Sequence, residues 1–347
     1  MTLLPVVLGL DYGGTKIAVA VCDLHGSQLA AQVVASGGEL GAQASFDRGI
    51  GVAHDLLDRR APGAKLAAVG VSTFGIPFED RVELAPAIPG WEKLAIGREL
   101  RTAFAGAQIR MATDAKAAAQ AETRWGALVG CDPAVYLNLG TGLAMAIVAG
   151  GRVVGGRHGA AGEIGYSLRS VSDVGLAAGQ RIPLEEMVSG QGLARRASGQ
   201  AGTGAPLAAA EVFTRTGSDA LTGLIAEFID ELAFHLVNLA IAVNPERIAV
   251  GGGLVGSWDR IGPRLQQALQ SGVPFPPELV VAHFPHDAPL IGAVALAVDA
   301  ALAADPALAT IPPATNVTDI DATDNPHETE DSEADGVRII LHQDTMA

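Results

Sequence analysis

Two glycine-rich turns in this chain each follow a run of apolar residues, and their residue types suit the binding of phosphate. The first turn is Gly13-Gly14-Thr15 in LGLDYGGTKIAVAV, and the second is Gly140-Thr141-Gly142 in LNLGTGLAMAI. Consecutive glycines let backbone amides approach a phosphate closely, while the threonine hydroxyls and Lys16 add donors. Each turn could instead be an ordinary hairpin turn, but matching turns in both halves of the chain favour a phosphate site. Neither is a P-loop or a Rossmann fingerprint, because the required spacing and following helix are missing.

Carboxylates at two expected strand ends could serve the transfer of a phosphoryl group. Asp11 ends a strand beside the first turn, where a carboxylate can hold a hydrated Mg²⁺ next to bound phosphates. Asp114, in RMATDAKAAAQAETRWGA, ends another strand and opens a helix. A helix N-cap alone would explain an aspartate there. The carboxyl ends of strands in α/β folds point into the ligand crevice, however, so Asp114 could also accept the proton of a substrate hydroxyl.

Two further glycine-rich segments could contact other parts of the substrates. GGRHGAAGEIGYS contains His158, Glu163 and Tyr166 and could present carboxylates to sugar hydroxyls, although a flexible surface loop has the same composition. In ERIAVGGGLVGS, the glycines at 251–253 could pass under an adenine or a ribose, although tight packing of a strand on a helix would also use them. The eight histidines and two cysteines show no spacing typical of a metal site.

The elements that would position these residues alternate between short β-prone runs and amphipathic helices. Strands at 4–10, 17–22 and 28–35 would form a three-stranded meander, and strands at 134–139, 143–149 and 152–155 repeat the same plan. We therefore expect an internal duplication of one α/β unit, with a ligand cleft between two lobes. Further strands are expected at 66–73, 108–112, 247–250 and 279–283, and helices at 46–57, 92–104, 115–125, from 184, and at 220–243, 259–269 and 290–304.

Composition and charge exclude several classes of protein. The 347 residues are 49% apolar and 18% charged, which permits a large core and is incompatible with wholesale disorder. No apolar run approaches the roughly 20 residues of a membrane span. Two cysteines cannot build a disulfide framework, and the N-terminus lacks the features of a signal peptide, so we expect a cytoplasmic protein.

The net charge of −15 argues against nucleic acid or an anionic membrane as the main partner. Much of this charge lies in residues 305–347, which contain ten acidic residues and a single basic one, Arg338. This acidic segment lacks a sustained apolar period, so we expect a disordered tail after a mildly acidic body.

The motifs together resemble those of the ROK family of sugar kinases and repressors, within the actin-like ATPase superfamily. LGLDYGGTKIAVAV and NLGTG resemble its two phosphate motifs, TDAKAAAQAE its catalytic segment, GAAGEIGY its sugar loop, LEEMVSG its helix start, NPERIAVGGGL its adenosine segment and IPGWEKL its PGW stretch. The resemblance covers residues 6–304. It implies a duplicated ribonuclease-H-like, actin-like ATPase fold of two lobes with an interdomain cleft. The small lobe would span residues 1–114 together with a helix at about 290–304, and the large lobe residues 115–289.

The resemblance also implies roles for individual residues. Asp114 falls on the catalytic base, and Asp11 on the residue that organises Mg²⁺ through water. The residues expected around the sugar are Gly75, Thr113, Asp114, Glu163, Tyr166 and Glu185. Those expected around ATP are Asp11, Gly13, Gly14, Thr15, Lys16, Gly140, Thr141, Gly142, Gly252 and Gly253. The resemblance further implies a homodimer.

Several positions depart from the family pattern. Zinc-bearing members carry three cysteines and the histidine of GEIGH, whereas SLRSVSDVGLAAGQRIPLE has no cysteine and Tyr166 replaces the histidine, so no zinc site is expected. Thr113 and Ala87 stand where asparagine is common. Lys116 would favour an ionised Asp114 if it points inward, but we favour a solvated position on the helix surface. Repressors of the family add an N-terminal winged helix, and because the first phosphate motif starts by Leu8, we do not expect a repressor.

The expected activity is that of an ATP-dependent, Mg²⁺-requiring kinase that phosphorylates the 6-hydroxyl of glucose or a glucose-like sugar. An amino sugar, kanosamine or a hexosamine, is the alternative substrate, because the sugar-side residues are altered and Glu163 and Glu185 would suit an ammonium group. A sugar-sensing protein without catalysis is the alternative to an enzyme, but it would not need Asp11, Asp114 and both phosphate turns. Polyphosphate stays open as the phosphoryl donor.

Overall fold

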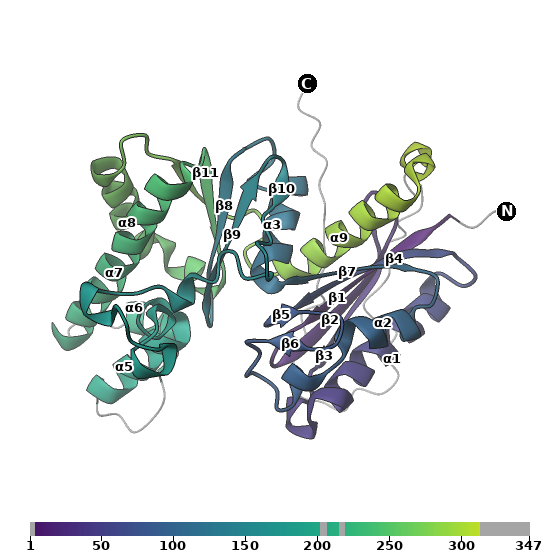
Figure 1. The fold of residues 1–347 in the computed structure, drawn as a ribbon, viewed down its shortest axis with the longest axis horizontal. Helices are drawn as coiled ribbons and strands as arrows, with labels where there is room; N and C mark the ends of the chain where they lie inside the picture. Colours follow the sequence, from purple (N-terminus) through teal and green to yellow (C-terminus); the bar gives the residue numbers. More distant parts are fainter. Residues whose placement is uncertain (1–3, 202–206, 215–218, 313–347) are drawn as a thin grey trace. The chain divides into compact units, whose positions relative to one another are not determined.

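The computed structural model describes residues 4–201, 207–214 and 219–312, and they divide into two compact units. Unit 1 comprises Met1–Ala117 and Pro289–Ala347, and unit 2 comprises Ala118–Ala288. Each unit is built on one five-stranded sheet (Figure 1). The sheet of unit 1 contains β1 (Val6–Tyr12), β2 (Lys16–Cys22), β3 (Gln28–Ala35), β4 (Leu66–Thr73) and β7 (Gln108–Thr113), and that of unit 2 contains β8 (Ala134–Leu139), β9 (Leu143–Ala149), β10 (Arg152–Val153), β11 (Arg247–Gly251) and β12 (Glu278–Val281).

The two sheets share one topology. The strand order is β3-β2-β1-β4-β7 in unit 1 and β10-β9-β8-β11-β12 in unit 2. In both sheets the first three strands along the chain form an antiparallel meander, and the two later strands run parallel to the first. The predicted α/β class and internal duplication are therefore confirmed.

Successive side chains of β1 point to opposite faces of the sheet of unit 1, and different helices cover the two faces. Leu8 and Leu10 belong to a buried cluster with residues of α1 (Ala42–Arg60) and α2 (Ile96–Ala103). Helix α9 (Ala288–Ala304) lies along the opposite face (Figure 1), where a Cβ built on Gly9 would lie 2.6 Å from Val294 Cγ2. The close approach of α9 therefore depends on the absence of a side chain at this position of β1.

In unit 2 the sheet packs against a group of helices. Apolar residues of β8 join one buried cluster with those helices. The helices are α4 (Leu184–Val188), α5 (Gly190–Ala201), α6 (Ala209–Thr214), α7 (Asp219–Val243) and α8 (Trp258–Gly272). The boundary between the units falls within α3 (Asp114–Trp125). None of the helices in the described ranges is long and apolar enough to cross a membrane.

One predicted helix is shorter than expected, and a second, for which no end was predicted, has 5 residues. The helix predicted over 92–104 is replaced by a 3₁₀ turn, Trp91–Lys93, and then α2, because Leu94 between them is extended. The helix predicted from Leu184 ends at Val188, since Ser189 is extended, and α5 begins directly afterwards. A small hairpin of β5 (Ile76–Pro77) and β6 (Val82–Glu83) was not predicted, because two-residue strands show no periodicity.

The start of the acidic tail also differs from the prediction. Residues Pro306–Thr310 form a 3₁₀ helix rather than disordered chain, because the Asp305 carboxylate caps it by accepting the Ala307 N–H at 3.1 Å. The next residue, Ile311, contacts the β2–β3 turn through its carbonyl oxygen, 2.7 Å from His25 Nε2. The rest of the predicted tail, residues 313–347, lies outside the described residues.

Candidate active site

The parallel strands of unit 1 bring two of the predicted carboxylates to one edge of the sheet. Tyr12 of β1 pairs with Thr73 of β4, which pairs in turn with Thr113 of β7. Asp11 precedes Tyr12 and Asp114 follows Thr113, so the two aspartates lie at the same end of the sheet with β4 between them. This is the carboxyl edge, where α/β folds bind their ligands.

Asp114 begins α3, and its side chain is partly exposed. Its Oδ1 atom accepts a hydrogen bond from the N–H of Ala115 at 2.7 Å. The neighbouring alanines, Ala115 and Ala117, are buried, which fixes the first turn of the helix. The carboxylate is thus held on a rigid element at the strand end.

Lys116 is buried, which corrects the solvated position that we favoured from the sequence. Its side chain is only 6% exposed, and its Nζ atom donates to Thr113 Oγ1 at 3.4 Å. The reason is local, because Thr113 ends β7 directly before α3 and its Oγ1 atom also accepts the Lys116 N–H at 3.4 Å in the first turn of the helix. The hydroxyl at the position of the family's asparagine therefore contacts a lysine.

The first glycine turn joins β1 to β2 and is exposed at Gly14 and Thr15. The N–H of Gly13 donates to the carbonyl of Lys16 at 2.9 Å, which closes the turn. Ser36, just after β3, donates its hydroxyl to Gly14 O and its N–H to Thr15 O, both at 2.9 Å. The carbonyl oxygens of Gly14 and Thr15, which would repel a phosphate, are therefore already hydrogen-bonded to Ser36. Sequence reasoning missed Ser36, because its role depends on the pairing of β2 with β3.

The end of β4, between the two aspartates, is fixed by Gly75 and Trp91. Gly75 has a φ of +77°, and a Cβ there would lie 2.6 Å from Ala85 Cβ and 2.7 Å from Glu83 O. Trp91, of the PGW stretch, is fully buried and donates its Nε1–H to Thr73 Oγ1 at 3.2 Å. Only glycine permits this backbone conformation. The loop therefore needs Gly75 for its shape, in addition to the sugar contact expected of this residue.

In unit 2 the second glycine turn is held by the start of α5. The N–H of Gly190 donates to Gly140 O at 2.9 Å, and the N–H of Gln191 donates to Thr141 O at 3.1 Å. Here too the carbonyl oxygens of the turn are engaged, as Ser36 engages those of the first turn.

The sugar loop is joined to β9 at Gly162. The N–H of Met145 donates to Gly162 O at 3.0 Å, and a Cβ on Gly162, whose φ is +88°, would overlap Met145 O. Tyr166 ends the 3₁₀ turn that follows Glu163 and is 45% exposed. Burial of the phenol, and then the charges of Glu185 and Glu163, raise the pKa of Tyr166. The charges of Glu185 and Glu163 therefore act on Tyr166, which remains a neutral hydrogen-bond donor at pH 7.

The segment after Tyr166 is closed by Arg181. Its Nη1 atom donates to Ser167 O at 2.9 Å, and its Nη2 atom donates to Tyr166 O at 2.6 Å. An ion pair between Arg169 and Glu231 ties the same segment to α7. Sequence reasoning missed these arginines, because their partners are backbone carbonyls and a distant helix.

The glycines of the adenosine segment follow β11. Gly252 has a φ of +92°, and a Cβ there would lie 2.6 Å from Leu139 O and 2.7 Å from Asn138 Oδ1. Gly252 and the exposed Gly253 therefore lie beside the end of β8, where the second glycine turn begins.

Comparison with known proteins assigns this fold to a family, since the model of the ROK family matches residues 7–300. The chain belongs to the ROK family. One ROK relative, the kanosamine kinase of Amycolatopsis mediterranei, is 29% identical over 301 residues, which cover 84% of this chain and 96% of the relative. The ROK hexokinase of Thermus thermophilus is 29% identical with a TM-score of 0.71, covering 85% of this chain and 98% of that structure.

A ROK glucokinase from Streptomyces griseus, in complex with glucose and AMPPNP, is 28% identical with a TM-score of 0.67, covering 83% of this chain and 98% of that structure. The predicted membership of the ROK family and its actin-like ATPase fold are confirmed. The relatives are sugar kinases that differ in their sugars.

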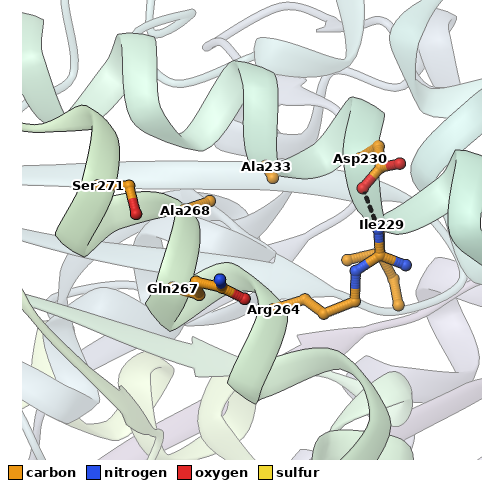
Figure 2. Close-up of a pocket in the computed structure, with 7 residues that line it drawn as sticks. All are labelled: Ile229, Asp230, Ala233, Arg264, Gln267, Ala268 and Ser271. Carbon is orange, nitrogen blue, oxygen red and sulfur yellow. Dashed lines mark hydrogen bonds and ion pairs between the residues drawn. The ribbon is translucent and has the colours of Figure 1, made fainter.

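A surface pocket between α7 and α8 does not coincide with the predicted ROK site residues (Figure 2). Its two charged side chains, Arg264 and Asp230, form an ion pair with each other. The pocket thus offers a ligand no unpaired charge. Its lining consists of Ile229, Asp230, Ala233, Arg264, Gln267, Ala268 and Ser271.

Glu122, in the segment TDAKAAAQAE, is fully buried, and sequence reasoning did not single it out. Its carboxylate accepts hydrogen bonds from the N–H groups of Ala127 at 2.7 Å, His283 at 3.0 Å and Phe284 at 2.8 Å. It therefore joins the end of α3 to the chain that follows β12. The sequence showed only that a glutamate ends the alanine-rich stretch AAAQAE. That pattern does not reveal which groups bond to the carboxylate.

Proposed function

We propose that this ROK protein is an ATP-dependent hexose kinase that transfers the γ-phosphoryl group of ATP to the 6-hydroxyl of glucose or a glucose-like sugar. The observation that carries the proposal is the register of β1, β4 and β7, which aligns Asp11 and Asp114 at one sheet edge. A protein that only senses sugar would need neither a base nor a phosphate turn beside it.

In the proposed reaction, Asp114 accepts the proton of the 6-hydroxyl as the oxygen attacks the γ-phosphorus. The new oxygen–phosphorus bond forms while the bond to the β,γ-bridging oxygen breaks, and ADP leaves with that electron pair. The sugar would be oriented by the residues predicted to bind it. Besides Asp114 itself, these residues are Gly75, Thr113, Glu163, Tyr166 and Glu185.

The phosphates of ATP would be bound by both glycine turns, in which backbone N–H groups and threonine hydroxyls act as donors. Gly252 and Gly253 would lie under the nucleoside. The donor set fits Mg²⁺, which keeps several waters and binds through one or two carboxylates together with substrate phosphates. Asp11 supplies such a carboxylate, and within the described ranges no three His, Cys, Asp or Glu side chains form a closed metal site. When bound, Mg²⁺ would neutralise charge on the transferring group.

An amino sugar is the second candidate substrate. Glu163 and Glu185 lie near enough to Tyr166 to raise its pKa, so two negative charges gather where the sugar is expected. Such a pair would stabilise an ammonium group as well as hydroxyls, and one relative is a kanosamine kinase. A homodimer and a cytoplasmic location stay predictions.

The substrate is tested with a panel of glucose, mannose, glucosamine, N-acetylglucosamine and kanosamine, each with ATP and Mg²⁺. We expect ADP release with glucose or an aminohexose, and the highest kcat/KM identifies the substrate. A parallel series with polyphosphate must follow the sugar phosphate itself, because no ADP is formed. Binding of a sugar without turnover by either donor would contradict the proposal and favour a sensor.

Arg181 offers a test of how the sugar loop is positioned. Arg181→Ala removes two hydrogen bonds that close the segment after Tyr166, so we expect the KM for the sugar to rise by about fivefold with little change in kcat. The segment should also become more sensitive to limited chymotrypsin digestion. Arg195→Ala, which breaks only an exposed ion pair with Glu186, serves as the control. An unchanged KM and digestion pattern in Arg181→Ala would show that the segment is held by other contacts.

A further inference from the structure

The side chain of Glu185 lies between the second glycine turn and the sugar loop. Its Oε2 atom accepts a hydrogen bond from the N–H of Leu143 at 2.9 Å, and a Cβ built on Gly142 would lie 2.6 Å from the same oxygen. On the other side, a Cβ built on Gly165 would lie 3.2 Å from Glu185 Cβ. The carboxylate of Glu185 therefore contacts the turn directly, and the Cβ of the same side chain packs against the loop that carries Glu163 and Tyr166.

The same short stretch of chain holds the remainder of the turn. Glu185 begins a stretch that ends at Gln191, where the N–H groups of Gly190 and Gln191 donate to the carbonyls of Gly140 and Thr141. Hydrogen bonds from this stretch thus reach both the start of the turn and Leu143, the residue that follows it. The position of the stretch determines the shape of the turn.

We propose that Glu185 is a positioning residue for the phosphate turn, so that sugar binding and nucleotide binding are coupled through its carboxylate. The proposal rests on the function proposed above and gives Glu185 a second role beside contact with the sugar. A carboxylate has about four acceptor positions, so it can keep the Leu143 N–H while it accepts a sugar hydroxyl. A sugar that holds this carboxylate in one position also holds the glycine turn in one conformation. Less conformational entropy is then lost when a nucleotide binds.

The decisive measurement is nucleotide affinity without sugar. A residue that only contacts the sugar does not affect AMPPNP binding in the absence of sugar. If Glu185 positions the turn, Glu185→Ala weakens binding of AMPPNP–Mg²⁺ by about tenfold in calorimetry without sugar. Glu185→Gln keeps a carbonyl oxygen that can accept the Leu143 N–H, so its affinity should stay within about threefold of the wild-type value.

Glu186→Ala is the matched control, because it removes a carboxylate from the neighbouring position of α4 whose partner is Arg195. We expect it to bind AMPPNP with wild-type affinity. In the wild-type protein, glucose or the best sugar of the panel should tighten AMPPNP binding, and Glu185→Ala should lose this coupling.

Hydrogen exchange gives a readout that needs no ligand. The Leu143 amide should exchange faster in Glu185→Ala than in the wild-type protein or in Glu185→Gln, while the melting temperature shows that each variant is folded. Unchanged AMPPNP affinity or unchanged Leu143 protection in Glu185→Ala would overturn the inference and leave the proposed kinase function intact. Failure of the wild-type protein itself to bind AMPPNP would instead overturn the proposed function, and this inference with it.

Discussion

Asp114→Ala is expected to lower kcat by at least about a hundredfold, because loss of a general base typically costs 10²- to 10⁴-fold. Without the carboxylate, the 6-hydroxyl has no positioned acceptor for its proton as the new bond to phosphorus forms. The KM values should change much less, since the glycine turns and the other side chains expected to bind the sugar are untouched. The measurement is steady-state ADP release with the best sugar of the panel, together with a melting curve.

The competing role of Asp114 is structural, because an aspartate at the start of a helix stabilises it by about 1 kcal/mol. Asp259→Ala is the matched control, since it removes a carboxylate from the first turn of α8, a residue with no proposed role in binding or catalysis. Asp114→Asn keeps the side chain's shape and most of its capping ability but cannot act as a base. If Asp114→Asn retains near-normal turnover, the assignment of the base is wrong, and Asp114 serves only to begin α3.

Glu122→Ala is expected to lower the free energy of unfolding by about 3 kcal/mol or more, because each buried donor left without an acceptor costs about 1–3 kcal/mol. Three backbone N–H groups lose their acceptor at once. Glu122→Gln should be destabilising as well, since an amide presents one oxygen and its NH₂ would face donors. Urea unfolding followed by tryptophan fluorescence suits this test, because unit 2 contains Trp125 and Trp258.

Glu227→Ala provides the comparison, since the Glu227 side chain is 68% exposed in its ion pair with Arg196. An exposed pair of this kind contributes about 0–1 kcal/mol, so this variant should unfold close to the wild-type midpoint. A Glu122→Ala protein as stable as the Glu227→Ala protein would mean that water replaces the carboxylate and that Glu122 does not hold α3 to the chain after β12.

The sequence predicted the strands and their duplication well, because each strand carries its own apolar period and each meander its own glycine turn. Strands β4 and β8 have the same bounds as the apolar runs that predicted them. Contacts between residues far apart in the chain could not be predicted in this way. Ser36 reaches the first glycine turn only once β3 pairs with β2, and Glu122 meets the amides of His283 and Phe284 only after β12 is in place.

In the candidate site, too, local motifs were predictable from the sequence and long-range contacts were not. The types and spacing of Asp11, Asp114 and the glycines indicated phosphoryl transfer, because such chemistry depends on local motifs. The burial of Lys116 and the two hydrogen bonds of Arg181 were not predictable, since charged side chains are usually solvated and neither pattern reveals a partner.

The packing of α9 on the sheet of unit 1 has a consequence for synthesis of the chain. The strands of unit 1 leave the ribosome first, but the face at Gly9 stays uncovered until α9, which ends at Ala304, has followed. Unit 2 is continuous in sequence and can complete its core earlier. Unit 2 is therefore able to fold before unit 1. Until α9 has been synthesised, unit 1 keeps an apolar sheet face exposed, and binding by a chaperone would protect this face from aggregation.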